Sequence, residues 1–207
     1  MVDAARVDCR QCRDAEALSF DFSMAFQPIV DLDSRQPLAH EALVRGPAGE
    51  GADWVFARVN PDNRYRFDQA CRVKAIELAA RLGLPGYLSI NFMPNAVYDP
   101  AACLRTTLAA ADRFGFPTDR IVFEFTEGER VEDLRHLKRI VQHYQSRGFR
   151  VALDDFGAGY AGLGLLTELQ PDVIKLDMSL IRGLDQDPRR RAIVEHTHAL
   201  CRSLGIL

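Results

Sequence analysis

Residues 150–160 read RVALDDFGAGY, a short apolar run that ends in two adjacent acidic residues and a glycine-rich loop. Such a run has the length and the apolar, β-branched content of a buried strand. Five similar runs lie elsewhere in the chain, and segments with helical periodicity separate the later ones. The predicted strands cover residues 25–32, 38–45, 87–92, 121–126, 150–154 and 173–176. This alternation is typical of an α/β fold with a largely parallel sheet.

The first two predicted strands are separated only by residues 33–37, a gap too short for a crossover helix, so they should pair as an antiparallel hairpin. Three segments with apolar residues at steps of three and four predict helices, each followed closely by a glycine, the residue that most often ends a helix. They are residues 67–82, 134–144 and 188–204, followed by Gly83, Gly148 and Gly205. We expect one domain over residues 24–207 behind an N-terminal extension at residues 1–23.

Composition excludes several classes of protein. With 26 Lys and Arg against 29 Asp and Glu, the net charge of -3 gives no general attraction for a polyanion, so we expect no DNA binding. No apolar stretch approaches the roughly 20 residues of a membrane span, and the N-terminus lacks a secretory h-region, so a cytoplasmic protein is expected. The five cysteines are odd in number and scattered, which fits reduced thiols. Cys9 and Cys12 could bind metal or change redox state, but no second pair accompanies them.

Most of the predicted strands carry a charged or amide side chain within or at the end of the apolar run. These residues are Glu41, Asn91, Glu124, Asp154, Asp155 and Lys175. An ionised carboxylate is costly to bury unless it is paired or binds a metal. Any one of them alone would more often be a cap or part of a surface salt bridge. Because the C-terminal ends of parallel barrel strands converge on one mouth, their succession predicts a single site there.

The donor atoms of this predicted site are carboxylate and amide oxygens, which suit hard cations such as Mg²⁺ or Mn²⁺ rather than zinc. Asp154 and Asp155 would repel each other strongly without cations nearby, so a two-metal site is expected. Two metal ions side by side are a known device for phosphodiester cleavage. Lys175 either supplies a directed positive charge beside the reacting water or pairs with the same carboxylates, and the two roles are compatible.

Several blocks of sequence, in order along the chain, resemble the EAL domain of bacterial cyclic di-GMP phosphodiesterases. The motif that names the family stands here as Glu41-Ala42-Leu43. The other blocks are Gln27-Pro28-Ile29, Ser89-Ile90-Asn91, Glu124-Phe125-Thr126-Glu127, DDFGAGY at residues 154–160, and Lys175-Leu176-Asp177. The resemblance covers residues 24–207 and implies a TIM-like (β/α)8 barrel whose first hairpin is antiparallel.

The resemblance also implies roles for individual residues. The positions that match the family's metal ligands, for Mg²⁺ or Mn²⁺, are Glu41, Asn91, Glu124, Asp154 and Asp155. Lys175 matches its catalytic lysine, and Glu41 and Asp154 are implied to take part in catalysis as well. Gln27 is implied to contact a guanine, Arg45 a phosphate, and Glu127 to hold the glycine-rich loop, which the family also uses in dimerisation. The implied reaction is metal-dependent hydrolysis of one phosphodiester bond of cyclic di-GMP by a homodimer, giving linear 5'-pGpG.

The chain departs from the family pattern at its end. Beyond the position of residue 207 the family continues into a strand with Ala-Glu-Gly-Val-Glu, whose first glutamate belongs to the active site, and then into a further strand and helix. We therefore expect a barrel without its C-terminal strands, with two open sheet edges, and weak or absent activity of this chain as it stands. The alternative is a non-catalytic regulator of this family that binds cyclic di-GMP or a protein partner. The fold alone would also permit an unrelated metal-dependent barrel enzyme.

Overall fold

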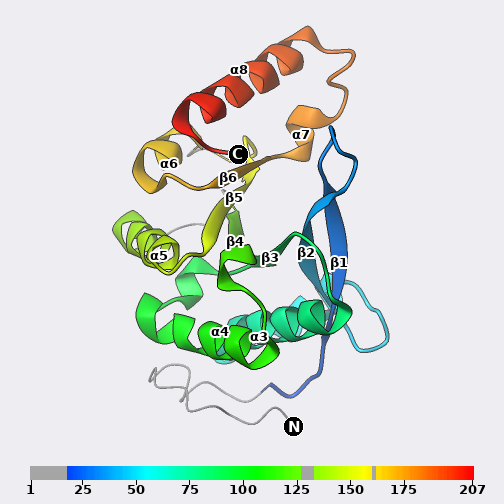
Figure 1. The fold of residues 1–207 in the computed structure, drawn as a ribbon, viewed down its shortest axis with the longest axis vertical. Helices are drawn as coiled ribbons and strands as arrows, with labels where there is room; N and C mark the ends of the chain where they lie inside the picture. Colours follow the sequence, from blue (N-terminus) through cyan, green and yellow to red (C-terminus); the bar gives the residue numbers. More distant parts are fainter. Residues whose placement is uncertain (1–17, 127–132, 160–161) are drawn as a thin grey trace.

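The computed structural model describes residues 18–126, 133–159 and 162–207 of the chain. Its strands form one sheet in which spatial order follows chain order, with β1 antiparallel to β2 and every later pair parallel. The strands are β1 (Ser23–Val30), β2 (Pro37–Arg45), β3 (Tyr87–Asn91), β4 (Ile121–Thr126), β5 (Arg150–Phe156) and β6 (Val173–Leu176). The predicted hairpin and parallel sheet are both confirmed, and Figure 1 shows the sheet running from the hairpin to β6.

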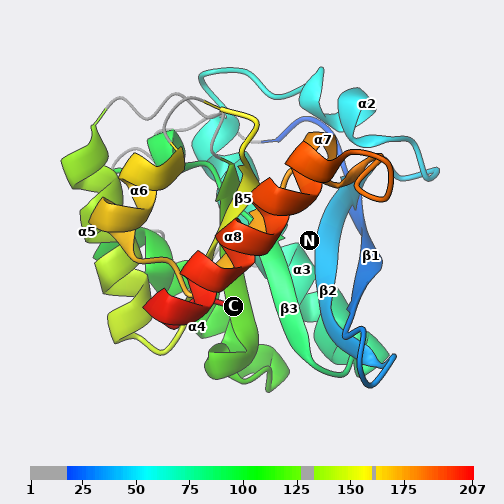
Figure 2. The same cartoon turned by 90° about the horizontal axis from the view of Figure 1, so that it is seen from above.

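Helices connect and cover the strands. They are α2 (Ala52–Phe56), α3 (Arg64–Leu82), η1 (Pro94–Ala96), α4 (Pro100–Phe114), η2 (Thr118–Arg120), α5 (Leu134–Ser146), α6 (Gly162–Leu169), α7 (Met178–Ile181) and α8 (Pro188–Leu204). The helix α3 packs against β1 and β3, and α5 packs against β5. Figure 2 shows α5 and α6 on the side of the sheet away from the β1–β2 hairpin. No helix in the described ranges is long and apolar enough to span a bilayer.

The three helices predicted from the sequence correspond to α3, α5 and α8. The helix α8 covers residues 188–204 as predicted, and Gly205 ends it in the left-handed conformation with φ 71°. The helix α4 was not predicted, although its start has clear signals: Asp99 accepts a hydrogen bond from the Ala102 N–H, and Pro100 occupies the first turn.

Four of the six predicted strands have other bounds in the structure: β1 begins at Ser23, β2 begins at Pro37 and β3 ends at Asn91, and two further differences have clear local causes. The strand β1 ends at Val30 because the chain turns over residues 31–36, which leaves Leu32 88% exposed. The strand β5 continues beyond the acidic pair to Phe156, because its pairing with β6, interrupted by a bulge after Leu153, resumes between Phe156 and Leu176. A bulge places extra residues on one strand and redirects their side chains. The acidic pair lies in this bulge.

In the middle of the sheet, side chains on one face pack in the hydrophobic core, and side chains on the other face belong to the polar site. In β4, Phe123 and Phe125 are 0% and 1% exposed and belong to the main apolar cluster. The Phe123 ring lies 4.8 Å from that of Tyr144 and 5.3 Å from that of Phe149, measured between centroids. Each such burial stabilises the fold by about 1.5–3 kcal/mol. Because successive side chains of a strand point to opposite faces, Glu124 is directed away from these rings.

The described sheet is open, with β1 and β6 at its edges. Beside β6, the Leu207 N–H donates to the Asp172 carbonyl at 3.0 Å, and the Ile174 N–H donates to the Leu207 carbonyl at 2.9 Å. These slanted bonds are the pattern of a parallel pair. The backbone after α8 therefore already lies along the β6 edge, in the direction of the other parallel strands.

We expect Gly86→Ala to lower the free energy of unfolding by about 3 kcal/mol or more, and the matched control Gly83→Ala by only about 1–2 kcal/mol. Both glycines have positive φ, 71° and 61°, so both substitutions carry the same backbone penalty. A Cβ at Gly86 would lie 2.2 Å from the Leu38 carbonyl oxygen, whereas the described part of the chain leaves open space at Gly83. Urea unfolding followed by circular dichroism measures both losses. Equal losses would contradict the tight contact between Gly86 and β2.

Candidate active site

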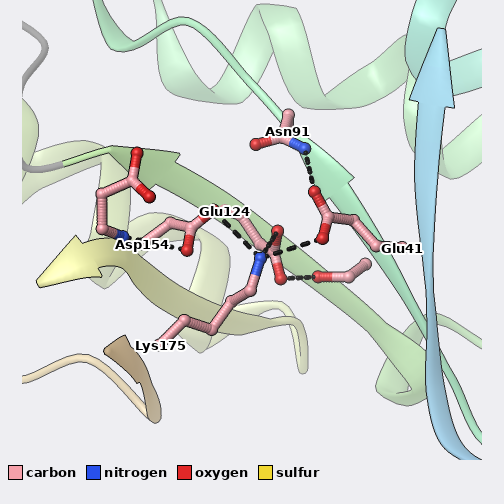
Figure 3. Close-up of polar contacts among 7 residues, drawn as sticks. Glu41, Asn91, Glu124, Asp154 and Lys175 are labelled. Carbon is pink, nitrogen blue, oxygen red and sulfur yellow. Dashed lines mark hydrogen bonds and ion pairs between the residues drawn. The ribbon is translucent and has the colours of Figure 1, made fainter. Parts of the chain in front are cut away.

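Strand register brings four of the predicted site residues to one face of the sheet. Asn91 of β3 pairs directly with Glu124 of β4. Glu41 of β2 pairs with the residue two positions before Asn91, and Glu124 pairs with the residue two positions before Asp154 of β5. Residues two apart on a strand share a face, as do paired residues on neighbouring strands. All four side chains therefore point into the same space, as Figure 3 shows.

Lys175 of β6 occupies the centre of this group. Its Nζ lies 3.0 Å from Glu41 Oε2, 2.9 Å from Glu124 Oε2 and 3.0 Å from Asp154 Oδ2. One oxygen from each of these carboxylates lies within 4.8 Å of the other two. Negative charges this close repel one another strongly unless a cation lies among them. The lysine ammonium supplies that positive charge.

The environment shifts the pKa values of both Glu124 and Lys175. Burial raises the pKa of the Glu124 carboxyl, with the nearby Lys175 ammonium acting against it and the Glu41 carboxylate adding to it. Burial lowers the pKa of Lys175, but the carboxylates of Glu124, Glu41 and Asp154 raise it by more, so that its pKa lies above the usual lysine range. In this arrangement Lys175 is therefore protonated at neutral pH.

Neutral side chains hold the other oxygens of the two glutamates. The Ser89 hydroxyl donates to Glu124 Oε1, and the Asn91 amide Nδ2 donates to Glu41 Oε1 at 3.0 Å. Each glutamate thus has one oxygen fixed by a neutral donor and the other directed at Lys175. Sequence reasoning did not assign Ser89 a role. Its position two residues before Asn91 on the same strand was the available signal, since it places both on one face.

Asp155 lies beside this group in an unusual backbone conformation. Its φ is 54°, in the left-handed region that few residues other than glycine adopt, and its N–H donates to Asp154 Oδ1 at 2.9 Å. Burial raises the pKa of the Asp155 carboxyl, and the neighbouring Asp154 and Asp177 carboxylates raise it further. The bulge thus keeps both acidic side chains near the site instead of sending one of them to the opposite face. Asp155 is not among the three carboxylates that converge within 4.8 Å.

The residues predicted to contact the substrate lie around this centre. Gln27 is exposed and pairs with Glu41 across the hairpin, so its side chain is on the same face. Arg45 lies four residues beyond Glu41 on β2, again on that face, and its Nη1 donates to the Val44 carbonyl at 2.7 Å. Glu127, predicted to hold the glycine-rich loop, lies outside the described residues. The roles of all three stay predictions.

The arrangement of these strands and acidic residues matches a known family. A family model described as the EAL domain matches residues 12–207. The chain belongs to the EAL domain family. Its TIM-like α/β fold with an antiparallel first hairpin is thereby the EAL fold, as the sequence predicted.

Curated relatives of this EAL domain have regulatory and enzymatic names. The blue light- and temperature-regulated antirepressor BluF of Escherichia coli is 31% identical over 183 residues, which are 88% of this chain and 45% of that protein. The cyclic di-GMP phosphodiesterase RocR of Pseudomonas aeruginosa is 32% identical over 131 residues, which are 61% of this chain and 32% of that protein. The chain spans less than half the length of these relatives.

Solved EAL structures share the fold closely. A standalone EAL protein from Vibrio cholerae, bound to cyclic di-GMP, has a TM-score of 0.88 and 56% identity, covering 92% of this chain and 80% of that one. The manganese and cyclic di-GMP complex of Klebsiella pneumoniae BlrP1 has a TM-score of 0.81 and 35% identity, covering 89% of this chain and 47% of that one.

We expect Lys175→Met to lower the free energy of unfolding by about 1–3 kcal/mol in EDTA, because three carboxylates lose their cation. Added Mn²⁺ should raise the melting temperature of this variant more than that of the unchanged protein, because a divalent ion compensates the same charges. Lys138→Met is the matched control. Its partner Glu168 lies 3.0 Å away with both side chains more than 40% exposed, so its loss should stay within about 0.5 kcal/mol. Equal stability of the two variants in EDTA would count against the carboxylate cluster.

Proposed function

We propose that this EAL domain is a divalent-metal-dependent cyclic di-GMP phosphodiesterase that hydrolyses one phosphodiester bond to give linear 5'-pGpG. One observation carries the proposal. Carboxylates from β2, β4 and β5 converge on the Lys175 ammonium at the C-terminal ends of parallel strands. Active sites of parallel barrels are built at this end of the strands. The complexes of related EAL structures with cyclic di-GMP support the choice of substrate.

The donor set fits Mg²⁺ or Mn²⁺. We propose that Glu41, Asn91, Glu124, Asp154 and Asp155 hold two such ions. All five offer oxygen, the donor that hard divalent cations prefer, and three of them already converge on one point. When bound, the cations would activate water and neutralise charge on the phosphodiester. The manganese in the related BlrP1 structure supports this choice.

Other side chains of the protein would bind the substrate and orient the reacting water. The adjacent carboxylates raise the pKa of Lys175, so its ammonium is placed to donate hydrogen bonds. It would orient the attacking water or stabilise negative charge on the phosphate. We propose that Arg45 binds a phosphate and Gln27 a guanine, since both lie on the face that carries Glu41. Glu127 would hold the loop at residues 156–162.

A non-catalytic regulator is the second candidate function. The relative BluF, 31% identical to this chain, is named an antirepressor. A regulator would bind cyclic di-GMP or a protein partner on this scaffold without turnover. The catalytic candidate is favoured because Glu41, Glu124 and Asp154, which match metal ligands of the family, already contact Lys175.

We further propose that the domain acts as a homodimer. The glycine-rich loop, which the family uses for dimerisation, leads into α6, and Leu163 at the start of this helix is 63% exposed. Size-exclusion chromatography with light scattering should give a molar mass twice that of one chain. The Leu163→Glu variant should give the mass of a single chain. A monomer in both cases would overturn this proposal. A cytoplasmic location stays a prediction from the sequence.

The test of the phosphodiesterase is chromatographic detection of pGpG from cyclic di-GMP with Mg²⁺ or Mn²⁺. We expect Glu41→Gln and Asp154→Asn to lower kcat/KM by at least about 100-fold, because each removes a charged oxygen donor from the site. Glu168→Gln, an exposed carboxylate on α6, is the control and should leave the rate unchanged.

The assay should use the native protein. Its intact mass should be measured first, to show how its length compares with residues 1–207. If it is longer than residues 1–207, we expect this chain alone to turn over more slowly, because its sheet has open edges. Tight binding of cyclic di-GMP by calorimetry without pGpG release from the native protein would favour the regulator. Release of pGpG that does not depend on added metal would contradict the proposed metal-dependent hydrolysis.

A further inference from the structure

The helix α3 carries an ion pair that is fully buried behind the site. Arg72 Nη2 lies 2.6 Å from Asp68 Oδ2, and the two side chains are 0% and 2% exposed. Removing two charges from water is costly, and buried ion pairs can often be replaced by apolar residues of similar size with no loss of stability. Stability alone therefore does not account for a charged pair at this position, and its contacts identify what else it does.

Both members of the pair contact the segments that carry the site residues. Asp68 Oδ1 accepts a hydrogen bond from the Met93 N–H at 3.0 Å. The Arg72 guanidinium lies 5.6 Å from the Phe92 ring and 5.1 Å from the Phe123 ring, measured to the centroids. Phe92 directly follows Asn91, and Phe123 directly precedes Glu124. The pair thus lies immediately behind the ends of β3 and β4.

The end of β3 is held by two successive backbone N–H groups. The Phe92 N–H donates to the Glu124 carbonyl at 2.9 Å, which ties the segment to β4. The Met93 N–H donates to Asp68, which ties it to α3. Asn91 itself is exposed, so its own side chain has little packing to fix it. The two bonds that follow it, together with the buried Phe92 side chain, hold the backbone that carries it.

Space beside this segment makes the second bond important. A cavity of about 180 Å³ is lined by Asp68, Asn91 and Met93, together with apolar side chains of β1, β2 and α3. Densely packed neighbours would hold a strand end without a specific bond, whereas a cavity lets it move. Asp68 is the polar contact that opposes such movement from the α3 side.

We propose that Asp68 is a positioning residue that, through its bond to the Met93 N–H, fixes the end of β3 so that the Asn91 amide meets Glu41 in the geometry needed for divalent-cation binding. This inference rests on the proposed function, because it assigns Asn91 to the metal site. Arg72, the ion-pair partner of Asp68, donates from its Nη1 to the Tyr144 hydroxyl at 2.8 Å. Residues that orient metal ligands commonly change metal affinity by 10–100-fold when they are replaced.

The test compares two double variants that both lack the ion pair. In Asp68→Asn/Arg72→Met the asparagine oxygen can still accept from the Met93 N–H, whereas in Asp68→Leu/Arg72→Met no acceptor remains. Titration calorimetry with Mn²⁺ alone, in nucleotide-free buffer, should give a Kd close to that of the unchanged protein for the asparagine variant. The leucine variant should bind about tenfold or more weakly. Turnover should follow the same order.

Tyr144→Phe is the matched structural control. It removes a partner of Arg72 but leaves Asp68 and its bond to Met93, so it should lower the melting temperature without changing the Mn²⁺ affinity. Amide hydrogen exchange at Met93 in the unchanged protein needs no variant. We expect this amide to be protected, and Mn²⁺ to raise its protection, because coupling between two sites is reciprocal.

The outcomes separate this inference from the proposed function. An unchanged protein that binds no Mn²⁺ overturns the proposed function and this inference with it. Mn²⁺ binding by the unchanged protein, with equal affinity in both double variants, overturns the inference alone. The inference also fails if affinity falls in all three variants in proportion to their loss of stability, or if the Met93 amide exchanges as freely as one without a partner.

Discussion

The electrostatic contact between one lysine and three carboxylates organises this protein. Strand alternation places Glu41, Glu124 and Asp154 on one face, within 4.8 Å of one another, where their mutual repulsion would force the strands apart. The Lys175 ammonium relieves that repulsion, and Ser89 and Asn91 orient the glutamates around it. Strand register brings these groups to their separations. The three carboxylates are therefore already gathered around one cationic side chain.

The opposite face of the same strands offsets the free energy lost when these carboxylates are removed from water. In β4, Glu124 alternates with Phe123 and Phe125, so the residues that bury the most apolar surface flank a carboxylate whose pKa burial raises. Apolar burial on the helix side offsets the unfavourable desolvation on the site side, within a single strand. Functional sites commonly break local rules of sequence in this way while the surrounding core sustains the fold.

The sequence predicted those helices and strands whose bounds depend on interactions between residues close together in the chain. The strands at residues 121–126 and 173–176 and the helix at residues 188–204 were predicted with the bounds that the structure has, because apolar periodicity and a terminal glycine specify them. The convergence of the charged residues followed from barrel geometry. The bond from Ser89 to Glu124 and the contact of Asp68 with Met93 could not be predicted, since they join residues 35 and 25 positions apart through tertiary packing. The left-handed conformation of Asp155 likewise depends on a bulge that no propensity encodes.

The agreement of strand order with chain order has a consequence for how the molecule assembles. Each strand from β2 onward pairs with the strand made just before it, so the sheet can grow in the order in which a ribosome releases the chain, with the hairpin as the first edge. Lys175 arrives on β6, after all the strands that carry the acidic residues. Nascent chains that have folded only as far as β5 hold the acidic residues without their counter-charge, so docking of β6 gains electrostatic energy that earlier docking steps lack.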